Sequence, residues 1–378
     1  MKYKILLVAG ARPNFMKIAP ILRALENISR IKSVLVHTGQ HYDQNMSASF
    51  FSSLGIKSPN YNLEVGSGTH AIQTANIMMR FEEVCLKEKP DLVLVVGDVN
   101  STIASGLVAK KLCIDLAHVE AGLRSRDRSM PEEINRIATD SISDLFFTTE
   151  KEGSENLLME GVDASRIHFV GNVMVDNLYY EVDKINGAPS TLAASMKQKL
   201  PKKYMCMTMH RPSNVDDKDT ITRLLRAIKK ISEIAPVIFP CHPRTKKNME
   251  RFGLMALFSE FAAEKAVCKN GLYITEPLDY DDFLYLWKDA NLLLTDSGGL
   301  QVETTALSIP CLTMRDTTEC PITIGIGSNI LAGTDANKII DYGTQALNGN
   351  WKKSAIPEFW DGKASERIVE VIKKIYHI

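Results

Sequence analysis

The chain alternates short apolar runs with amphipathic stretches, which is the pattern of repeated strand and helix units. In the first half, the expected strands are Ile5–Ala9, Ser33–His37, Leu92–Val96, Leu116–Val119, Leu145–Thr148 and Ile167–Val170. In the second half, they are Tyr204–Met209, Val237–Pro240, Leu272–Thr275, Asn291–Thr295, Cys311–Arg315 and Asn329–Leu331. Two such series predict an α/β protein with two parallel sheets.

A change of pattern separates the two series. After Asn172 the chain is mostly helical and polar, and Gly187-Ala188-Pro189-Ser190 interrupts it before strands resume. We therefore expect an N-terminal domain over residues 1–172 and a C-terminal domain over residues 173–360. Near the end of the chain, apolar residues at helical spacing predict an amphipathic closing helix, namely Ile368, Val371, Ile372 and Ile375.

Composition narrows the range of partners. The 378 residues include 45 Lys and Arg and 45 Asp and Glu, so the bulk charge favours neither nucleic acid nor a membrane surface. No apolar run approaches the roughly 18 residues of a membrane span, and the first apolar run is too short for a signal peptide, so we expect a cytoplasmic protein. The cysteines form no Cys-x-x-Cys pair and the histidines lack zinc-ligand spacing, which predicts no metal site.

The strongest local signal is a strand followed by Asp296-Ser297-Gly298-Gly299 and a helical pattern. Such a turn leaves backbone N–H groups free at a helix N-terminus, where a diphosphate fits, and glycines allow its close approach. Ser297 could equally be an ordinary helix cap. Glu303, in the first turns of the helix, could accept two ribose hydroxyls or be a solvated helix residue, and the sequence leaves both interpretations open.

A second loop, from Gly10 to Lys17, follows the first strand. It lacks the G-x-G-x-x-G fingerprint, which argues against a dinucleotide cofactor and a dehydrogenase. It presents Arg12 and Lys17, which could neutralise a departing diphosphate, although two basic residues near a helix start are more often simply solvated.

Carboxylates follow two of the expected strands. Asp98 comes after Leu92–Val96, and Glu120 after Leu116–Val119, so both should face one crevice at the carboxyl edge of the sheet. Glu132 stands at an expected helix start, where it or its neighbour Glu133 could merely complement the helix dipole. Each carboxylate could also pair with a nearby arginine. Several acids in one pocket are nevertheless what proton transfer on a sugar requires.

Histidines follow strands as well. His210 and His242 occupy such positions in the second half, and His41 does so in the first. A lone histidine is more often a hydrogen-bonding residue than a catalyst, but the edge placement favours a role in a site.

Taken together, the motifs resemble those of the non-hydrolysing UDP-N-acetylglucosamine 2-epimerases, in order over nearly the whole chain. The matching segments are Gly10–Lys17, Thr38–His41, Gly97–Thr102, His118–Ser125, Pro131–Arg136, His210-Arg211, His242-Pro243, Asp296–Gly299 and Met314–Glu319. Many members have Glu where Asn14 stands and Arg where Cys320 stands. The second departure removes a positive charge that could neighbour the nucleotide.

The resemblance implies a GT-B architecture, with two Rossmann-like domains, a cleft between them, and a C-terminal helix over 361–378 that crosses back to the first domain. It implies a UDP-sugar substrate, no cofactor and a homodimer. The implied catalytic residues are Asp98, Glu120, Glu132 and His210; the implied UDP-binding residues are Arg12, Lys17, His242, Ser297, Gly298, Gly299 and Glu303.

The chemistry of the implied reaction fits these residue types. The C2 hydrogen of an N-acetylhexosamine has no adjacent carbonyl, so departure of UDP must accompany its removal, giving a 2-acetamidoglucal to which UDP returns. Such a reaction needs positive and N–H groups for the phosphate and acids on two faces of the ring. A 2-epimerase of a UDP-diacetamido-uronate sugar and a GT-B glycosyltransferase remain alternatives.

Overall fold

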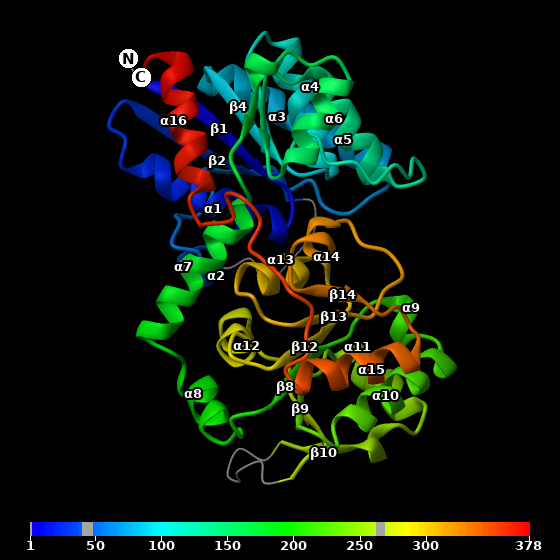
Figure 1. Cartoon of the computed structure of the whole chain (residues 1–378). Coiled ribbons are helices and arrows are strands. Elements are labelled where there is room, and N and C mark those ends of the chain that lie inside the picture. The colour runs from blue at the N-terminus through cyan, green and yellow to red at the C-terminus, as the bar shows by residue number, and fades with distance from the viewer. Residues whose placement is uncertain (1, 40–47, 262–268) are drawn as a thin grey trace. The chain divides into compact units, whose positions relative to one another are not determined.

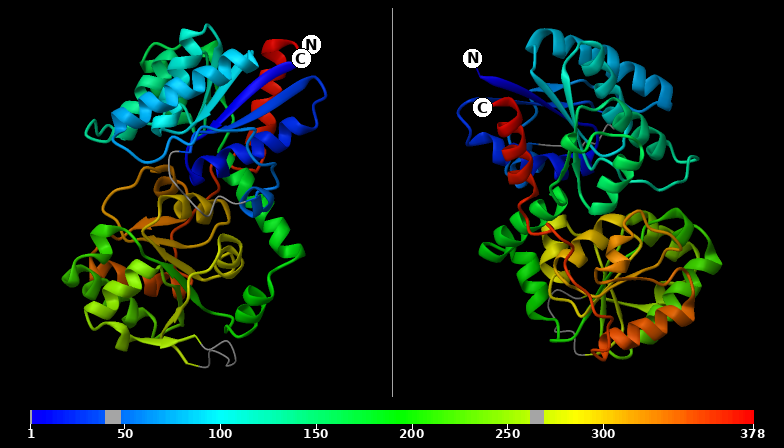
Figure 2. Two further views of the ribbon diagram at one scale, coloured as in Figure 1. Left: turned by 180° about the vertical axis from the view of Figure 1, so that it is seen from behind. Right: turned by 45° about the horizontal axis from the view of Figure 1, so that its top comes forward.

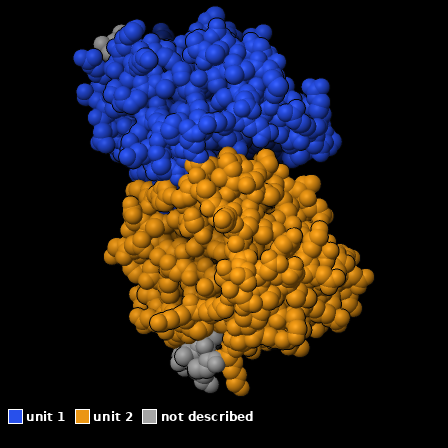
Figure 3. Space-filling model, viewed as in Figure 1, with its two compact units in different colours: residues 1–178, 358–378 blue, residues 179–357 orange. Residues whose placement is uncertain are grey.

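The computed structural model describes residues 2–39, 48–261 and 269–378. The chain divides into two compact units (Figure 3): unit 1 comprises residues 1–178 and 358–378, and unit 2 comprises residues 179–357. The boundary between the two units, after Leu178, falls within helix α7 (Val173–Gly187). Each unit is built around its own parallel sheet (Figure 1).

Unit 1 contains a seven-stranded parallel sheet in the order β3-β2-β1-β4-β5-β6-β7. Its strands are β1 (Tyr3–Ala9), β2 (Ile31–His37), β3 (Tyr61–Asn62), β4 (Leu92–Val96), β5 (Asp115–Val119), β6 (Leu145–Thr148) and β7 (Ile167–Phe169). The central strands are almost continuously apolar because helices cover both of their faces.

The helices of unit 1 pack on opposite faces of this sheet (Figure 2). They are α1 (Arg12–Glu26), α2 (Ala48–Ser53), α3 (His70–Glu88), α4 (Asn100–Lys111), α5 (Pro131–Ile142), α6 (Lys151–Met159), the first part of α7, and α16 (Ala364–Tyr376), with a 3₁₀ turn at Ala164–Arg166. Alternate residues of β1 show the two layers: Ile5 and Leu7 join the core with α1 and α16, and Leu6 and Val8 join the core with α3 and α4.

Unit 2 repeats the design with seven parallel strands in the order β10-β11-β9-β8-β12-β13-β14. The strands are β8 (Met205–Thr208), β9 (Val237–Pro240), β10 (Phe258–Glu260), β11 (Leu272–Thr275), β12 (Leu292–Thr295), β13 (Cys311–Thr313) and β14 (Asn329–Leu331). The helices are α8 (Thr191–Gln198), α9 (Pro212–Val215), α10 (Lys218–Ile231), α11 (Pro243–Arg251), α12 (Tyr280–Trp287), α13 (Gly298–Ala306), α14 (Ile322–Gly325) and α15 (Ala336–Leu347), with a 3₁₀ turn at Met255–Leu257.

The predicted fold class, α/β with two Rossmann-like parallel sheets, is confirmed. Two strands were not predicted. Strand β3 has only two residues, too few to show any periodicity, and β10 is a short edge strand with two exposed residues, so it lacks the apolar run of a buried strand. The Cys311–Arg315 strand was predicted too long, since β13 ends at Thr313.

The closing helix α16 packs against α1 within unit 1, as predicted for the end of the chain. Its residues Ile368 and Ile372 are fully buried, whereas Ile375 remains 37% exposed. The Asp176 carboxylate accepts hydrogen bonds from the backbone N–H groups of Ala364 and Ser365, at 3.0 and 2.7 Å, and so caps the helix. None of the helices in the described ranges combines the length and apolarity needed to cross a membrane.

Candidate active site

In unit 1, the candidate residues lie where the strand order reverses. Strand β1 lies between β2 and β4, and chain segments leave the carboxyl ends of β1, β4 and β5 at the same edge. These segments carry Lys17, Asp98 and Glu120. Such a switch point is where doubly wound sheets bind their ligands.

An ion pair joins the first and third of these segments. Lys17 Nζ lies 2.5 Å from Glu120 Oε2, and both side chains are largely buried. Gly97 lies against the pair: a Cβ on this residue would stand 3.3 Å from Lys17 Nζ, 3.4 Å from Glu120 Oε2 and 3.6 Å from Asn14 Nδ2. Lys17 therefore meets a carboxylate in this structure, and a glycine makes room for the contact.

The backbone of Glu120 adopts an unusual conformation. Its φ of 69° places it in the left-handed region of backbone conformation, which residues other than glycine rarely adopt. Its N–H donates to the Phe147 carbonyl oxygen at 3.0 Å, which holds the chain in this turn at the end of β5. Strained backbone of this kind is concentrated at functional sites, which supports a role for Glu120 beyond packing.

Asp98 belongs to a second group of charges. Its Oδ2 lies 2.5 Å from Arg136 Nη2, and its carbonyl oxygen accepts a hydrogen bond from Asn135 Nδ2 at 3.0 Å. Arg136 also pairs with Glu133. Helix α5 therefore holds Asp98 through both its side chain and its backbone.

Glu132 and Glu133 turn out to differ. Glu133 is buried and accepts hydrogen bonds from the backbone N–H groups of Ser125 and Arg126, both at 2.9 Å. Burial opposes its ionisation, but these N–H groups and Arg136 outweigh burial and lower the pKa of Glu133. Glu132 is half-buried in the first turn of α5, and none of the described basic residues forms an ion pair with it.

Arg12 is exposed at the start of α1, with its guanidinium 5.2 Å from the centre of the Phe50 ring. Asn14 is buried, and its Oδ1 accepts a hydrogen bond from the Ala11 N–H at 3.0 Å, so this departure from the family pattern closes the first turn of the helix.

In unit 2, a buried carboxylate organises the corresponding edge, where β8 lies between β9 and β12. Asp296 is fully buried and accepts hydrogen bonds from the backbone N–H groups of His210 and Arg211, at 3.0 and 2.9 Å, and from Asn214 Nδ2 at 3.2 Å. His210 Nδ1 also lies 3.2 Å from Asp296 Oδ1. Asp296 thus orients His210, a role not anticipated although the residue opens the Asp-Ser-Gly-Gly motif.

The N-terminus of α13 is surrounded by charged groups. Ser297 occupies the cap position but its side chain makes no capping hydrogen bond. A Cβ on Gly298 would stand 3.4 Å from Glu319 Oε2 and 3.7 Å from Arg315 Nη1. Arg315 holds Glu319 through two hydrogen bonds of 2.8 and 2.9 Å, and Arg211 Nη2 lies 3.4 Å from the same carboxylate. Two arginines and the free N–H groups of a helix start make this edge suitable for an anion.

Glu303 points into the interior of unit 2. Tyr280 donates its hydroxyl hydrogen to Glu303 Oε1 at 2.9 Å, while the buried Oε2 has no partner among the described residues. Burial raises the pKa of Glu303 to about 7, although the Tyr280 hydrogen bond partly opposes this effect. A buried carboxylate oxygen without a partner is costly unless a ligand hydroxyl meets it.

The other candidates have plainer surroundings. His242 is exposed and caps α11, accepting a hydrogen bond from the Arg244 N–H at 3.3 Å. Gly299 lies in the first turn of α13. His41 lies outside the described residues.

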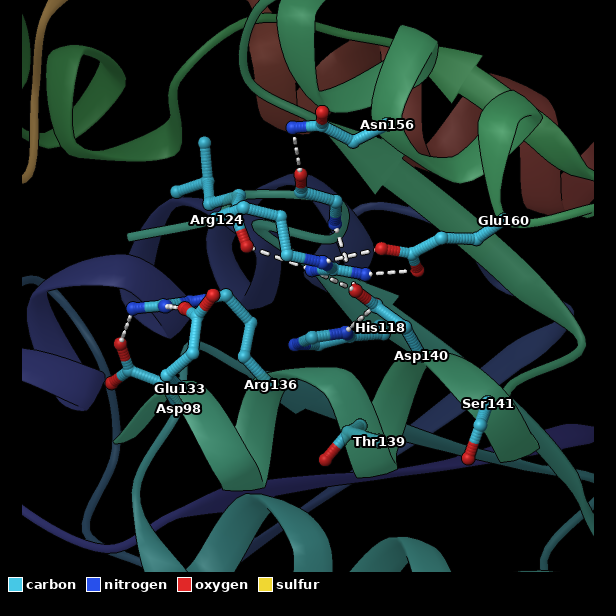
Figure 4. A network of polar contacts seen from close by, with 12 residues as sticks. Asp98, His118, Arg124, Glu133, Arg136, Thr139, Asp140, Ser141, Asn156 and Glu160 are labelled. Carbon is cyan, nitrogen blue, oxygen red and sulfur yellow. Dashed lines mark hydrogen bonds and ion pairs between the residues drawn. The ribbon is translucent and has the colours of Figure 1, made fainter. Parts of the chain in front are cut away.

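A polar network not predicted from the sequence lies in unit 1 beside the Asp98–Arg136 pair (Figure 4). His118 of β5 contacts Asp140 of α5, which pairs with Arg124, which in turn pairs with Glu160. His118 and Arg124 both lie within a recognised motif, but sequence alone gave no reason to separate them from its other residues.

The fold defines a class: two Rossmann-like units, each with its own parallel sheet, as in proteins of the GT-B-like fold. A match in fold alone supports this class, since the lipopolysaccharide outer core galactosyltransferase WaaB superposes with a TM-score of 0.56 at 13% identity, over 98% of this chain and 99% of that one. The family described as UDP-N-acetylglucosamine 2-epimerase matches residues 23–373, and the chain belongs to this family of isomerases.

Similar proteins cover nearly the whole chain. The UDP-N-acetylglucosamine 2-epimerase of Methanocaldococcus jannaschii is 43% identical over 373 residues, 98% of each chain. A crystal structure of the enzyme of that organism in complex with UDP-GlcNAc and UDP has a TM-score of 0.80, over 98% of this chain and 99% of that one, at 43% identity. The UDP-2,3-diacetamido-2,3-dideoxy-D-glucuronate 2-epimerase of Pseudomonas aeruginosa is 38% identical over 375 residues, 98% of this chain and all of that one.

Proposed function

We propose that this protein interconverts UDP-N-acetylglucosamine and UDP-N-acetylmannosamine, as a non-hydrolysing 2-epimerase. The observation that carries the proposal is the strained, buried Glu120, paired with Lys17 beside the Asp98 loop at the edge of the sheet. The full-length identity of 43% to an epimerase of this substrate supports it.

Unit 2 supplies the groups that would hold UDP. The start of α13, with Ser297, Gly298 and Gly299, would bind the diphosphate, together with Arg315. The unpartnered Oε2 of Glu303 would accept a ribose hydroxyl. From unit 1, Arg12 would add positive charge for the departing phosphate.

The reaction would proceed by anti elimination and re-addition. UDP would leave C1 as a carboxylate removes the C2 hydrogen, giving a 2-acetamidoglucal, and UDP would return as C2 is protonated on the opposite face. Positively charged side chains that contact the diphosphate would stabilise the negative charge that develops on it as the C1–O bond breaks. Asp98 and Glu120 would carry the protons, with Glu132 as a third acid or an orienting group and His210 beside the nucleotide.

Incubation in deuterated water tests this proposal directly. The protein should place deuterium at C2 of UDP-N-acetylglucosamine and form the manno epimer, both followed by proton NMR. Asp98→Asn and Glu120→Gln should abolish exchange while UDP still binds. Asp127→Asn, which changes an exposed carboxylate of the same unit, should leave both unaffected. Near wild-type exchange in the first two variants would refute the assignment of the acids.

A diacetamido-uronate substrate is the second candidate, because a relative at 38% identity has that activity by name. The same NMR assay with a panel of UDP-sugars separates the two, since the preferred sugar should exchange at C2 with the highest kcat/KM. A glycosyltransferase would exchange no deuterium at C2. The expected homodimer is checked by light scattering.

A further inference from the structure

The inference concerns His118, whose imidazole is enclosed beneath the loop that carries Asp98. The residue lies on β5 and none of its surface is exposed. Its Nδ1 lies 2.7 Å from Asp140 Oδ1, and its Nε2 lies 2.8 Å from the carbonyl oxygen of Gly97. Figure 4 shows the ring against the Asp140 carboxylate.

Both partners of the ring are hydrogen-bond acceptors. A carbonyl oxygen cannot donate, and Asp140 already accepts a hydrogen bond from the Gly122 N–H at 3.1 Å and pairs with Arg124 at 2.7 Å. Burial alone would raise the pKa of Asp140, but His118 and Arg124 lower it, so this residue is a carboxylate. A neutral imidazole has one hydrogen and would turn a lone pair toward one of these oxygens.

We propose that His118 carries a hydrogen on both ring nitrogens in the folded protein, and that this buried cation is a positioning residue that fixes the Gly97–Asp98 turn. The role in turnover rests on the proposed function, whereas the state of the ring does not.

The surroundings balance the proposed charge. Asp140 lies between His118 and Arg124, and Glu160 closes the series through two hydrogen bonds to Arg124, at 2.8 and 2.6 Å. Asp140 is therefore a buried carboxylate shared by the two cations, and Glu160, whose side chain is 44% exposed, pairs with Arg124 from the surface. The other charged groups near the Gly97 turn are the Lys17–Glu120 pair and Asp98 with Arg136.

The hydrogen bond to Gly97 has a consequence at the site. Gly97 has a φ of 67° and lies against the Lys17–Glu120 pair, and Asp98 is the next residue. A hydrogen bond that fixes the Gly97 carbonyl therefore fixes the peptide bond between Gly97 and Asp98, and with it the position of the Asp98 Cα that carries the side chain. Catalytic groups tolerate displacements of only a fraction of an ångström, so a support of this kind affects the rate.

The state of the ring is measured by nitrogen NMR on the intact protein with labelled histidines. At neutral pH, the His118 ring should show a hydrogen on both nitrogens, as expected from its two acceptor partners, and these signals should vanish in His118→Gln. If that variant does not fold, substituting the other histidines one at a time assigns the signal. A neutral His118 ring at neutral pH would overturn the proposal.

The positioning role is tested by activity. In His118→Gln, the deuterium exchange rate at saturating substrate should fall by about tenfold or more, with the Kd for UDP unchanged, because both donors of a glutamine sit on one nitrogen and cannot replace two ring nitrogens that face different oxygens. His168→Gln, which changes a half-buried ring on β7 of the same sheet, should alter neither. An unchanged rate in His118→Gln would refute the positioning role. Absence of exchange in the wild-type protein would instead refute the proposed function, and would leave the NMR result standing.

Discussion

Replacing Gly97 with alanine probes the edge of the unit 1 sheet with a single methyl group. The residue has a φ of 67°, so alanine would be strained there whatever its surroundings. The methyl carbon would also stand 3.3 Å from Lys17 Nζ, closer than a methyl normally packs, and in ordinary contact with Glu120 Oε2 at 3.4 Å. The substitution therefore has two effects, one on the backbone and one on the ion pair.

The sizes of the two effects follow from the geometry. The left-handed backbone costs about 1 kcal/mol for a residue other than glycine, which lowers Tm by ~2–4 °C in domains of about 150–250 residues. The Lys17 ammonium must move by a few tenths of an ångström to admit the methyl group, and this disturbs its pairing with Glu120. Because a 1 Å misplacement of catalytic groups costs about 100-fold in rate, we expect a loss of about tenfold in kcat.

The chain offers a matched control in Gly161. Its φ is 88°, and a Cβ there would meet nothing within 4 Å. Gly161→Ala should therefore lower Tm by a similar amount through strain alone and leave the rate unchanged.

The assay compares thermal unfolding, by circular dichroism, with the rate of deuterium incorporation at C2 of UDP-N-acetylglucosamine. The two variants should have similar Tm values, but Gly97→Ala should incorporate deuterium well below the rate of Gly161→Ala. Equal exchange rates in the two folded variants would show that the Lys17–Glu120 pair beside Gly97 takes no part in the reaction.

Three further predictions concern Glu303 and α16. Because the ionised Glu303 should accept a ribose hydroxyl and burial raises its pKa to about 7, UDP affinity measured by calorimetry should be full above that pH and weaken below it. Glu303→Gln should weaken binding and remove this pH dependence, and a persistent dependence would refute the role. Tyr280→Phe removes a hydrogen bond that lowers the Glu303 pKa, so the midpoint should move to higher pH, whereas Tyr285→Phe on the same helix should not move it. Asp176→Ala removes the cap of α16 and should destabilise unit 1 by ~1–2 kcal/mol in urea unfolding, and an unchanged midpoint would contradict the capping role.

Most of the fold could be predicted because its signals are local. The buried strands of both parallel sheets are apolar runs with abrupt ends. Because helices cover both faces of each sheet, these strands do not alternate between apolar and polar residues, so the runs are easy to recognise. Strands β3 and β10 escaped prediction because pairing with a neighbour, rather than their own composition, makes them strands.

The candidate site was only partly predictable. Strand ends indicated the edge on which Asp98, Glu120 and Lys17 lie, because chain direction alone places them there. Sequence could not tell that Lys17 pairs with Glu120, or that Glu133 rather than Glu132 anchors the loop before α5. These outcomes depend on distances between side chains far apart along the chain.

The sequence by itself determined the two parallel α/β halves, the edge where polar residues gather, and the family. Tertiary structure alone decided which of those residues are partners and which are not. It brought the Asp296 carboxylate within hydrogen-bonding distance of the His210 N–H, and it placed the His118 ring between two acceptor oxygens. It also left one oxygen of Glu303 without a partner among the described residues. The physical reason is that apolar periodicity is written in neighbouring residues, whereas hydrogen bonds and buried charges are settled only when distant segments pack together.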